Sequence, residues 1–383
     1  MHYFDNAATT FPKPEAVYQF MDTFYRTYGV NVGRGQFETA TKAASIVSQT
    51  REMLLELLGC NSSKEVIFTP SATEAMNVVL QGLNFTDGQV VYITPFEHNA
   101  VLRILNYLKT ILDLKVIPLD VDKKTLSYDI EMIKYTFQKE KPDYVIMTHA
   151  SNVFGNITPI KEVCELAKKH NATTIVDIAQ TAGLLDINLT NVLADYAIFA
   201  GHKTLYAPFG IAGFIANKSN SLSPFIYGGT GIDSINPSMP QSTPEKFEAG
   251  SQNILAIAGL NASLKWIKEI GIKNIRDKET ETTVKLLELL KSYYNITVIR
   301  SDDEENNIGV VSCVFDGYSS DSIGKILDEH NIAVRTGLHC APKAHEFIGT
   351  LPDGTVRFSV SYFTNNTDLE TLKKALDYIE ING

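Results

Sequence analysis

Side chains able to do chemistry follow several apolar runs of the chain. They are Ser71-Ala72-Thr73-Glu74, Glu97-His98, Ser151-Asn152, Asp177 with Gln180, and Gly201-His202-Lys203. Lys203 comes directly after a run typical of a buried strand, where the loss of hydration lowers the pKa of an amine and makes it a nucleophile. This chemistry suits Schiff-base formation. The alternative is a lysine that extends from the strand end into solvent.

Asp177 ends the apolar segment TTIVDIA. A carboxylate in that place can face the ring nitrogen of pyridoxal phosphate and keep it protonated, or it can simply cap the next turn. Ser71 and Glu74 form a helix capping box, whose first turn has free N–H groups for a phosphate, although most such boxes only cap. The chain thus contains, in this order, a phosphate site, a histidine able to stack on a ring (His98), Asp177 and Lys203. This combination indicates a pyridoxal phosphate enzyme.

The elements that position these residues follow from the hydrophobic pattern. Strand-like runs alternate with amphipathic helical segments between residues 64 and 216; the runs are EVIFTP, QVVYITP, LKVIPLD, DYVIMTHA, TTIVDIA, DYAIFAG and GIAGFIA. This alternation predicts an α/β fold with a mainly parallel, doubly wound sheet that binds ligands at the carboxyl ends of its strands. Residues 217–251, rich in Ser, Pro, Gly and Asn, predict a long loop.

Four more strand-like runs follow that loop: NITVI, GVVSCVF, IAVRTG and TVRFSVS. A last helix is expected to begin with a capping box from Thr367 to Glu370. We therefore expect a smaller C-terminal α/β domain that closes on the larger one.

Composition excludes several classes of function. The 383 residues are 44% hydrophobic, which is enough for a large core, and the net charge is −10 without any cluster of Lys and Arg. Neither nucleic acid nor an anionic membrane is therefore expected as a partner. The first residues lack the pattern of a signal peptide, and no apolar run reaches the ~18 residues of a membrane span, so we expect a cytoplasmic location.

The four cysteines form no Cys-x-x-Cys pair and predict neither a disulfide framework nor a metal site. Cys164 and Cys313 lie in apolar patterns and are expected to be buried, and Cys60 follows a predicted helix end. Cys340 differs, because the surrounding segment AVRTGLHCAPKAHE reads as an exposed, turn-rich loop.

The chain resembles the class V aminotransferases, and within them the group of cysteine desulfurases and selenocysteine lyases. The resemblance covers nearly the whole chain and is carried by YFDNAATT, SATEAMN, EHNAV, SNVFGNITPI, DIAQTAG, GHKTLYAPFGIAG, FEAGSQN, VRTGLHCAP and VRFSVSYFTN. It implies a fold type I pyridoxal 5'-phosphate-dependent transferase. Residues 16–258 would form the large cofactor-binding domain, and residues 1–15 and 259–383 the small domain.

The resemblance also implies roles for single residues. Lys203 would form the Schiff base, Asp177 would face the pyridinium nitrogen, Gln180 would bond to the phenolic oxygen, and His98 would stack on the ring and move protons. The phosphate would be bound by the amides of Ala72 and Thr73, the Thr73 hydroxyl, His202, and Ser251 of a second subunit, which implies a homodimer. The substrate pocket would hold Asn152 and Arg357, which bind the substrate carboxylate, and also Arg34 and Arg335.

The implied reaction converts L-cysteine to L-alanine and leaves the sulfur as a persulfide on Cys340, from which a sulfur-acceptor protein takes it. Only 17 positions separate Cys340 from Arg357, which resembles the group II enzymes with a short catalytic loop. His339 or Arg335 would assist thiolate formation. Ala200, Ser251 and Leu338 depart from the residues common in relatives. Alternatives are a selenocysteine lyase acting on L-selenocysteine, another β-lyase or aminotransferase, or a non-catalytic sulfur-relay scaffold.

Overall fold

The computed structural model describes residues 1–32, 35, 37–232 and 235–382. Within these ranges, seven strands form the larger sheet in the order β2-β8-β7-β6-β5-β3-β4. The strands are β2 (Lys64–Thr69), β3 (Val90–Ile93), β4 (Lys115–Pro118), β5 (Tyr144–Thr148), β6 (Thr173–Asp177), β7 (Tyr196–Ala200) and β8 (Ala212–Asn217). β8 runs antiparallel to both of its neighbours, and the remaining neighbouring pairs are parallel. The predicted mainly parallel sheet is therefore confirmed.

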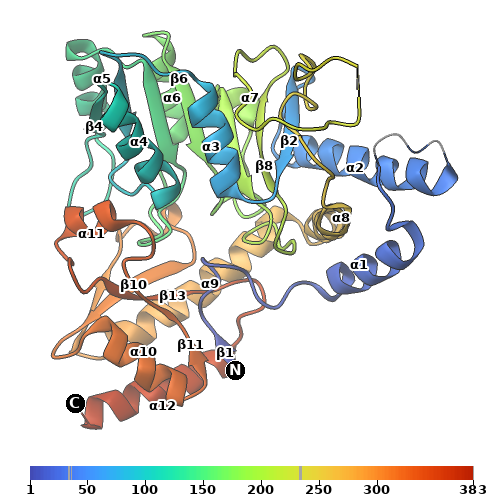
Figure 1. Ribbon diagram of the computed structural model, residues 1–383. Coiled ribbons are helices and arrows are strands. Elements are labelled where there is room, and N and C mark those ends of the chain that lie inside the picture. The colour runs from blue at the N-terminus through green and yellow to red at the C-terminus, as the bar shows by residue number, and fades with distance from the viewer. Residues whose placement is uncertain (33–34, 36, 233–234, 383) are drawn as a thin grey trace.

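Helices cover both faces of this sheet. They are α2 (Glu38–Leu57), α3 (Ala72–Gly82), α4 (Asn99–Ile111), α5 (Ile130–Lys139), α6 (Ile160–Lys168), α7 (Leu189–Val192) and α8 (Ile254–Ile270). The helix α1 (Glu15–Tyr28) instead packs on α2 and α8. The apolar sides of α3 and α4 pack on one face, and α3 and α4 stand in front of the strands in Figure 1. Helices α2, α5, α6 and α8 contribute to the core on the other face. Because both faces are covered, the strands are apolar almost throughout.

A second sheet of four antiparallel strands follows in the described part of the chain, in the order β12-β13-β10-β9. Its strands are β9 (Ile296–Ile299), β10 (Val310–Phe315), β12 (Arg335–Gly337) and β13 (Thr355–Ser359), and the short strands β1 (His2–Tyr3) and β11 (Ile332–Ala333) pair separately in parallel. The remaining elements are α9 (Ile272–Lys291), the 3₁₀ turn η1 (Glu304–Asn306), α10 (Ser320–Glu329), α11 (Pro342–Ile348) and α12 (Asn366–Asn382). Phe4 from the N-terminus belongs to the core of this second sheet.

Two local predictions can be compared with these elements. The described residues between 217 and 251 contain no helix or strand beyond the end of β8, so the long loop is confirmed. The start of the last helix was predicted wrongly, because Asn365 caps it: its Oδ1 accepts from the Thr367 amide at 2.9 Å, and Asp368 accepts from the Asn365 amide at 2.9 Å. The division into domains at residues 15/16 and 258/259 stays a prediction. None of the described helices has both the length and the apolar character needed to cross a membrane.

Candidate active site

The carboxyl ends of β5, β6 and β7 border one cavity of about 330 Å³. These ends are adjacent because the strand register pairs Thr148 with Asp177, and Asp177 with Ile198. The predicted site residues that line the cavity are Ala72, Thr73, His98, Asn152, Asp177, Gln180, His202, Lys203, Arg335, Cys340 and Arg357. The structure thus brings together groups that lie as far as 285 positions apart, from Ala72 to Arg357.

Lys203 lies just beyond the end of β7. Gly201 permits the chain to turn there, because an added Cβ would lie 2.6 Å from the Ile211 carbonyl oxygen. Burial lowers the pKa of the Lys203 amine to about 8, the negative charge of Asp177 partly opposes this, and Arg357 adds to the lowering. A neutral, nucleophilic amine is therefore available near neutral pH. The side chain lines the cavity, so the alternative of a lysine extending into solvent does not hold.

Asp177 is the last residue of β6. Its Oδ1 accepts from the Ala179 amide at 2.9 Å, so it does cap the following turn, as one alternative predicted. Among the described residues, no hydrogen bond is found for Oδ2. Burial raises the pKa of Asp177, while the Ala179 amide and Lys203 oppose the shift. The carboxylate can therefore hold the turn with one oxygen and face a positively charged group with the other.

His98 caps the N-terminus of α4. Its Nδ1 accepts from the Ala100 amide at 3.0 Å, and because a backbone N–H can only donate, the ring proton of neutral His98 must be on Nε2. Burial, together with the positive charges of Lys203 and Arg103, lowers the pKa of His98 to about 4. His98 is therefore a neutral ring whose tautomer is fixed by the helix cap.

The first turn of α3 provides donors for a phosphate. The Ser71 side chain accepts from the Glu74 amide at 3.1 Å, as the predicted capping box requires. The amides of Ala72 and Thr73 lie at the helix start, where N–H groups have no partner within the helix, and both residues line the cavity. His202 lines the same cavity, and its Nδ1 is buried without a partner in the described part of the chain. An amine, a carboxylate and these donors fit pyridoxal phosphate.

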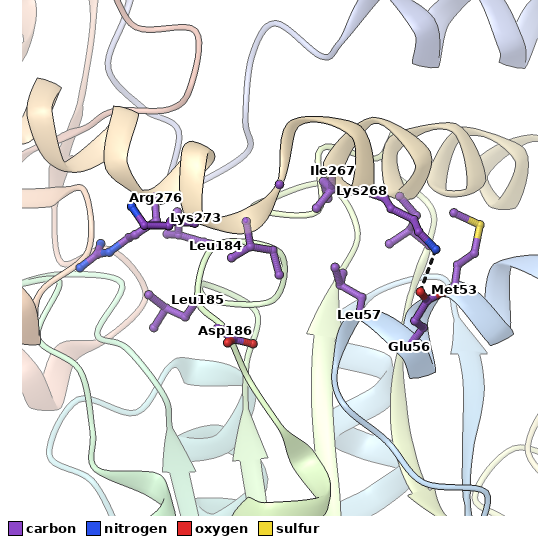
Figure 2. A pocket seen from close by; sticks show the side chains of 13 residues that line it. Met53, Glu56, Leu57, Leu184, Leu185, Asp186, Ile267, Lys268, Lys273 and Arg276 are labelled. Atoms are coloured by element: carbon purple, nitrogen blue, oxygen red, sulfur yellow. Dashed lines mark hydrogen bonds and ion pairs between the residues drawn. The ribbon is translucent and has the colours of Figure 1, made fainter.

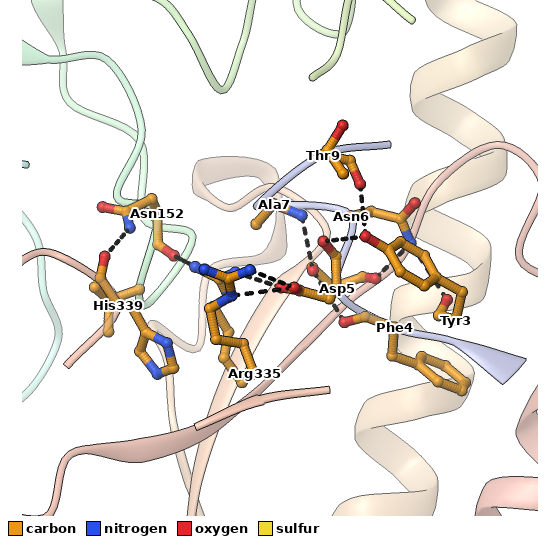
Figure 3. A network of polar contacts seen from close by, with 12 residues as sticks. Tyr3, Phe4, Asp5, Asn6, Ala7, Thr9, Asn152, Arg335 and His339 are labelled. Carbon is orange, nitrogen blue, oxygen red and sulfur yellow. Dashed lines mark hydrogen bonds and ion pairs between the residues drawn. The ribbon is translucent and has the colours of Figure 1, made fainter. Parts of the chain in front are cut away.

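The two arginines of the site are held by an aspartate. Asp5 Oδ1 accepts from Arg357 Nη2 at 2.7 Å, and Asp5 Oδ2 accepts from Nε and Nη2 of Arg335 at 3.0 and 2.9 Å. Arg357 Nη1 donates to the Asn152 carbonyl oxygen at 2.9 Å, and Asn152 Nδ2 donates to the His339 carbonyl oxygen at 2.8 Å. Figure 3 shows this network of polar contacts. The predicted carboxylate-binding residues are thus assembled, with an acidic partner already in place.

Cys340 does not lie in a long loop. It follows β12 and precedes α11, which begins with Pro342 at a position where proline suits a helix start. Residues 338–341 form the connection, in which His339 and Cys340 both have positive φ, 48° and 57°. The Asn99 amide donates to the Cys340 carbonyl oxygen at 2.7 Å. The predicted strand IAVRTG is present, whereas the prediction of a turn-rich loop was too broad, since it took the helix α11 for loop.

The four cysteines differ in exposure as predicted. Cys340 is exposed, Cys60 is half-buried, and Cys164 and Cys313 are buried. Burial raises the pKa of the Cys60 thiol to about 11 and that of Cys164 to about 12. Cys340 is thus the accessible thiol of the chain.

His339 cannot supply a positive charge to this thiol. Its Nε2 lies 3.0 Å from Thr355 Oγ1, and its ring packs near His345. Burial, together with Arg357 and His345, lowers the pKa of His339 to about 2. Of the two residues expected to assist thiolate formation, Arg335 alone carries a charge at neutral pH.

The other three predicted site residues, Gln180, Ser251 and Arg34, differ in their positions. Gln180 lines the cavity, and its Nε2 donates to the Ala7 carbonyl oxygen at 2.9 Å. Ser251 lies outside the cavity of its own chain and accepts from Asn31 Nδ2 at 3.1 Å. Arg34 lies outside the described residues.

Asp5 and Glu97 were not assigned a role from the sequence. Glu97 Oε1 accepts from Thr94 Oγ1 at 2.6 Å and from the Thr148 amide at 2.7 Å, and its Oε2 is buried without a partner among the described residues. Burial raises the pKa of Glu97 to about 8, so it holds a proton at neutral pH. The aspartate in YFDNAATT, separated from the strand β1 by Phe4 alone, was the available signal for Asp5.

A second cavity of about 620 Å³ lies between α2, α8, α9 and the segment 184–186 (Figure 2). Its walls are mainly aliphatic, and the Lys268–Glu56 ion pair of 2.7 Å lies at its edge. None of the residues predicted for chemistry lines it.

Comparison with known proteins gives consistent matches. Residues 2–372 match the family model of Aminotransferase class-V. A probable cysteine desulfurase of Methanothermobacter thermautotrophicus is 30% identical over 99% of the chain and 94% of that protein. A probable cysteine desulfurase of Halalkalibacterium halodurans is 31% identical over 98% of the chain and 92% of that protein. The solved apo structure of a cysteine desulfurase from Thermococcus onnurineus NA1 matches with a TM-score of 0.92 and 29% identity over 100% of the chain and 95% of that structure.

Proposed function

The chain belongs to the class-V aminotransferase family, and from this membership we propose that it is a pyridoxal phosphate-dependent cysteine desulfurase. The observation that carries the proposal is that Lys203 and Cys340 border the same cavity, close enough for a thiolate at Cys340 to raise the pKa of the lysine. An aminotransferase needs the lysine but has no use for a thiol at that place. A sulfur-relay scaffold without cofactor could use the thiol but would not need the lysine.

The residues at the cavity suit this cofactor. Lys203 would bind it covalently and Asp177 would face its ring nitrogen, while the phosphate would be held at the first turn of α3 and by His202. When bound, pyridoxal phosphate supplies an electron sink that stabilises negative charge on the carbon bearing the substrate amine.

Two residues of the chain can move protons at the substrate. The Lys203 amine, with a pKa of about 8, can accept and return a proton near neutral pH. His98 carries a proton on Nε2, because its Nδ1 is occupied by the Ala100 amide. Its pKa of about 4 keeps the ring from taking a second proton at neutral pH, so His98 would donate from Nε2 and recover the same proton.

Cys340 would receive the sulfur atom. Its thiolate attacks the substrate sulfur, the bond between that sulfur and the substrate Cβ breaks, and a new S–S bond leaves a persulfide on Cys340. The substrate carbon takes up protons and departs as L-alanine. The exposed position of Cys340, in a short connection between a strand and a helix, would then present the persulfide to a sulfur-acceptor protein.

Assembly and location complete the proposal. Ser251 lies outside the cavity of its own chain, which is consistent with a homodimer in which each Ser251 serves the phosphate of the other subunit. Phe209, stacked on His202 at 4.7 Å and 66% exposed at the cavity, leaves an apolar surface that a second subunit would cover. The sulfur-acceptor protein and the cytoplasmic location remain predictions from the sequence.

The experiment measures both products. The cofactor-loaded enzyme is incubated with L-cysteine and a reductant, and alanine and sulfide are quantified beside Cys340→Ala and the matched control Cys60→Ala. Equal amounts of alanine and sulfide from the parent and from Cys60→Ala, with both products lost in Cys340→Ala, are expected. Absence of alanine from the parent would refute the proposed activity.

A further inference from the structure

We propose that Asp5 is a resident carboxylate that holds Arg357 in the free enzyme and releases it to the carboxylate of the substrate. Asp5 is thereby a positioning residue that sets the affinity for the substrate. The inference rests on the proposed function for the identity of the substrate, whereas its test needs only a carboxylate ligand.

Arg357 is already paired with one carboxylate. A guanidinium has five N–H donors and binds a carboxylate best through two of them at once. Nη1 donates to the Asn152 carbonyl oxygen and Nη2 to Asp5, while Nε is buried without a partner in the described part of the chain. Arg357 is 2% exposed although it borders the cavity. Donors remain for a second carboxylate, but one that pairs with Nη2 would lie beside the like charge of Asp5, so its two-point contact is favoured when Asp5 gives up Nη2.

Arg335 makes this exchange possible. It donates to Asp5 Oδ2 from both Nε and Nη2, so Asp5 keeps a positively charged partner after Arg357 is released. The side chain of Arg335 is 47% exposed and that of Arg357 is 2% exposed, so the two arginines differ in freedom to move. Two guanidinium groups and one carboxylate leave one net positive charge, which the carboxylate of one substrate molecule would neutralise.

The backbone around Asp5 is fixed, so the exchange involves side chains. Asp5 bridges in parallel to Ser359, the Ser359 amide donates to the Phe4 carbonyl oxygen at 2.6 Å, and the Ala7 amide donates to Ser359 Oγ at 2.9 Å. Figure 3 shows the Asp5 side chain between this backbone and Arg335. The N-terminal segment therefore presents one carboxylate to both arginines.

The test uses propionate, which has a carboxylate but neither amine nor thiol. Its dissociation constant is measured by calorimetry for the cofactor-loaded parent, for Asp5→Asn, and for the control Glu304→Gln. Glu304 is a matched control because it pairs at 3.0 Å with the buried Arg300, whose Nε also has no partner among the described residues, and it does not line the cavity. Since the negative charge of Asp5 opposes a second carboxylate at Arg357, Asp5→Asn is expected to bind propionate about tenfold more tightly, and Glu304→Gln like the parent.

Equal or weaker binding of propionate by folded Asp5→Asn would overturn the inference. If that variant does not fold, a crystal structure of the parent with propionate decides. Propionate bound to Arg357 Nη2, with Asp5 retained by Arg335 alone, is the expected result, and an intact bond between Asp5 and Arg357 in the presence of bound propionate is the contrary one. Because propionate cannot be desulfurated, neither measurement depends on whether the proposed activity is correct.

Discussion

Arg335 and Arg357 lie directly opposite each other in the antiparallel pair β12–β13, and a single carboxylate, Asp5, binds both. Like charges in opposed positions of a ladder repel each other, so the pair of strands needs a negative charge between them. The N-terminal segment supplies it from the far end of the chain. The two arginines, for which we propose a role in binding the substrate carboxylate, are thus held close together by one negative charge.

This arrangement predicts a loss of stability when the charge of Asp5 is removed. Asp5→Asn leaves the buried Arg357 without its ionic partner and is expected to lower the free energy of unfolding by about 3 kcal/mol in the absence of ligand. Adding Arg335→Gln should restore part of that loss, because the opposed charge is gone. Urea unfolding of the single and double variants measures both effects, and a single variant as stable as the parent would contradict the account.

The role of Lys203 can be tested by covalent trapping. Borohydride reduction of the loaded enzyme should attach the cofactor permanently to the Lys203 peptide, and Lys203→Ala should carry no label and lose turnover by at least about a thousandfold. Lys13 is the control lysine, because burial also lowers its pKa, to about 7. Its Nζ already donates to the His202 carbonyl oxygen at 2.6 Å, so Lys13 is not expected to carry the label. Label found on Lys13, or on no lysine, would show that Lys203 was assigned wrongly.

Glu97 predicts a pH dependence of stability. Its pKa is raised from 4.5 to about 8, so the native state holds a proton that the unfolded state releases, and Glu97 makes the protein less stable as pH rises through this window. Glu97→Gln cannot ionise and keeps an acceptor for Thr94 and Thr148. The variant should gain in stability relative to the parent between about pH 5 and about pH 8, as measured by urea unfolding. A difference that does not change with pH would argue against the raised pKa.

Thiol reactivity tests the position of Cys340. Iodoacetamide should modify Cys340 at least about tenfold faster than Cys60, since burial raises the pKa of Cys60 to about 11 and thiolates are the reactive species. The buried Cys164 and Cys313 should react only after unfolding. Peptide mass spectrometry over a time course measures the order. Early modification of Cys60 with an unreactive Cys340 would contradict the structure.

Much of the site could be predicted from local sequence. Asp177 and Lys203 each end or follow a strand-like run, and a parallel sheet brings such ends to one edge, so the pattern was sufficient to place them together. The Ser71 cap was likewise read correctly, because a capping box is determined within four residues.

Longer-range features could not be predicted in this way. The role of Asp5 depends on its bridge to Ser359, which is 354 positions away and has no local signature. The segment after Cys340 was taken for a loop because proline is typical of turns, whereas Pro342 starts the helix α11. The preceding run IAVRTG was predicted as a strand, and its residues Arg335–Gly337 do pair with β13.

The atom that receives the sulfur can be identified directly. The cofactor-loaded enzyme is mixed with one equivalent of L-cysteine without reductant, quenched with an alkylating agent, digested and examined by mass spectrometry. One additional sulfur atom is expected on the Cys340 peptide, in an amount equal to the alanine formed, and none on the Cys60, Cys164 or Cys313 peptides. Alanine formed without any additional sulfur on Cys340 would show that Cys340 is not the sulfur acceptor.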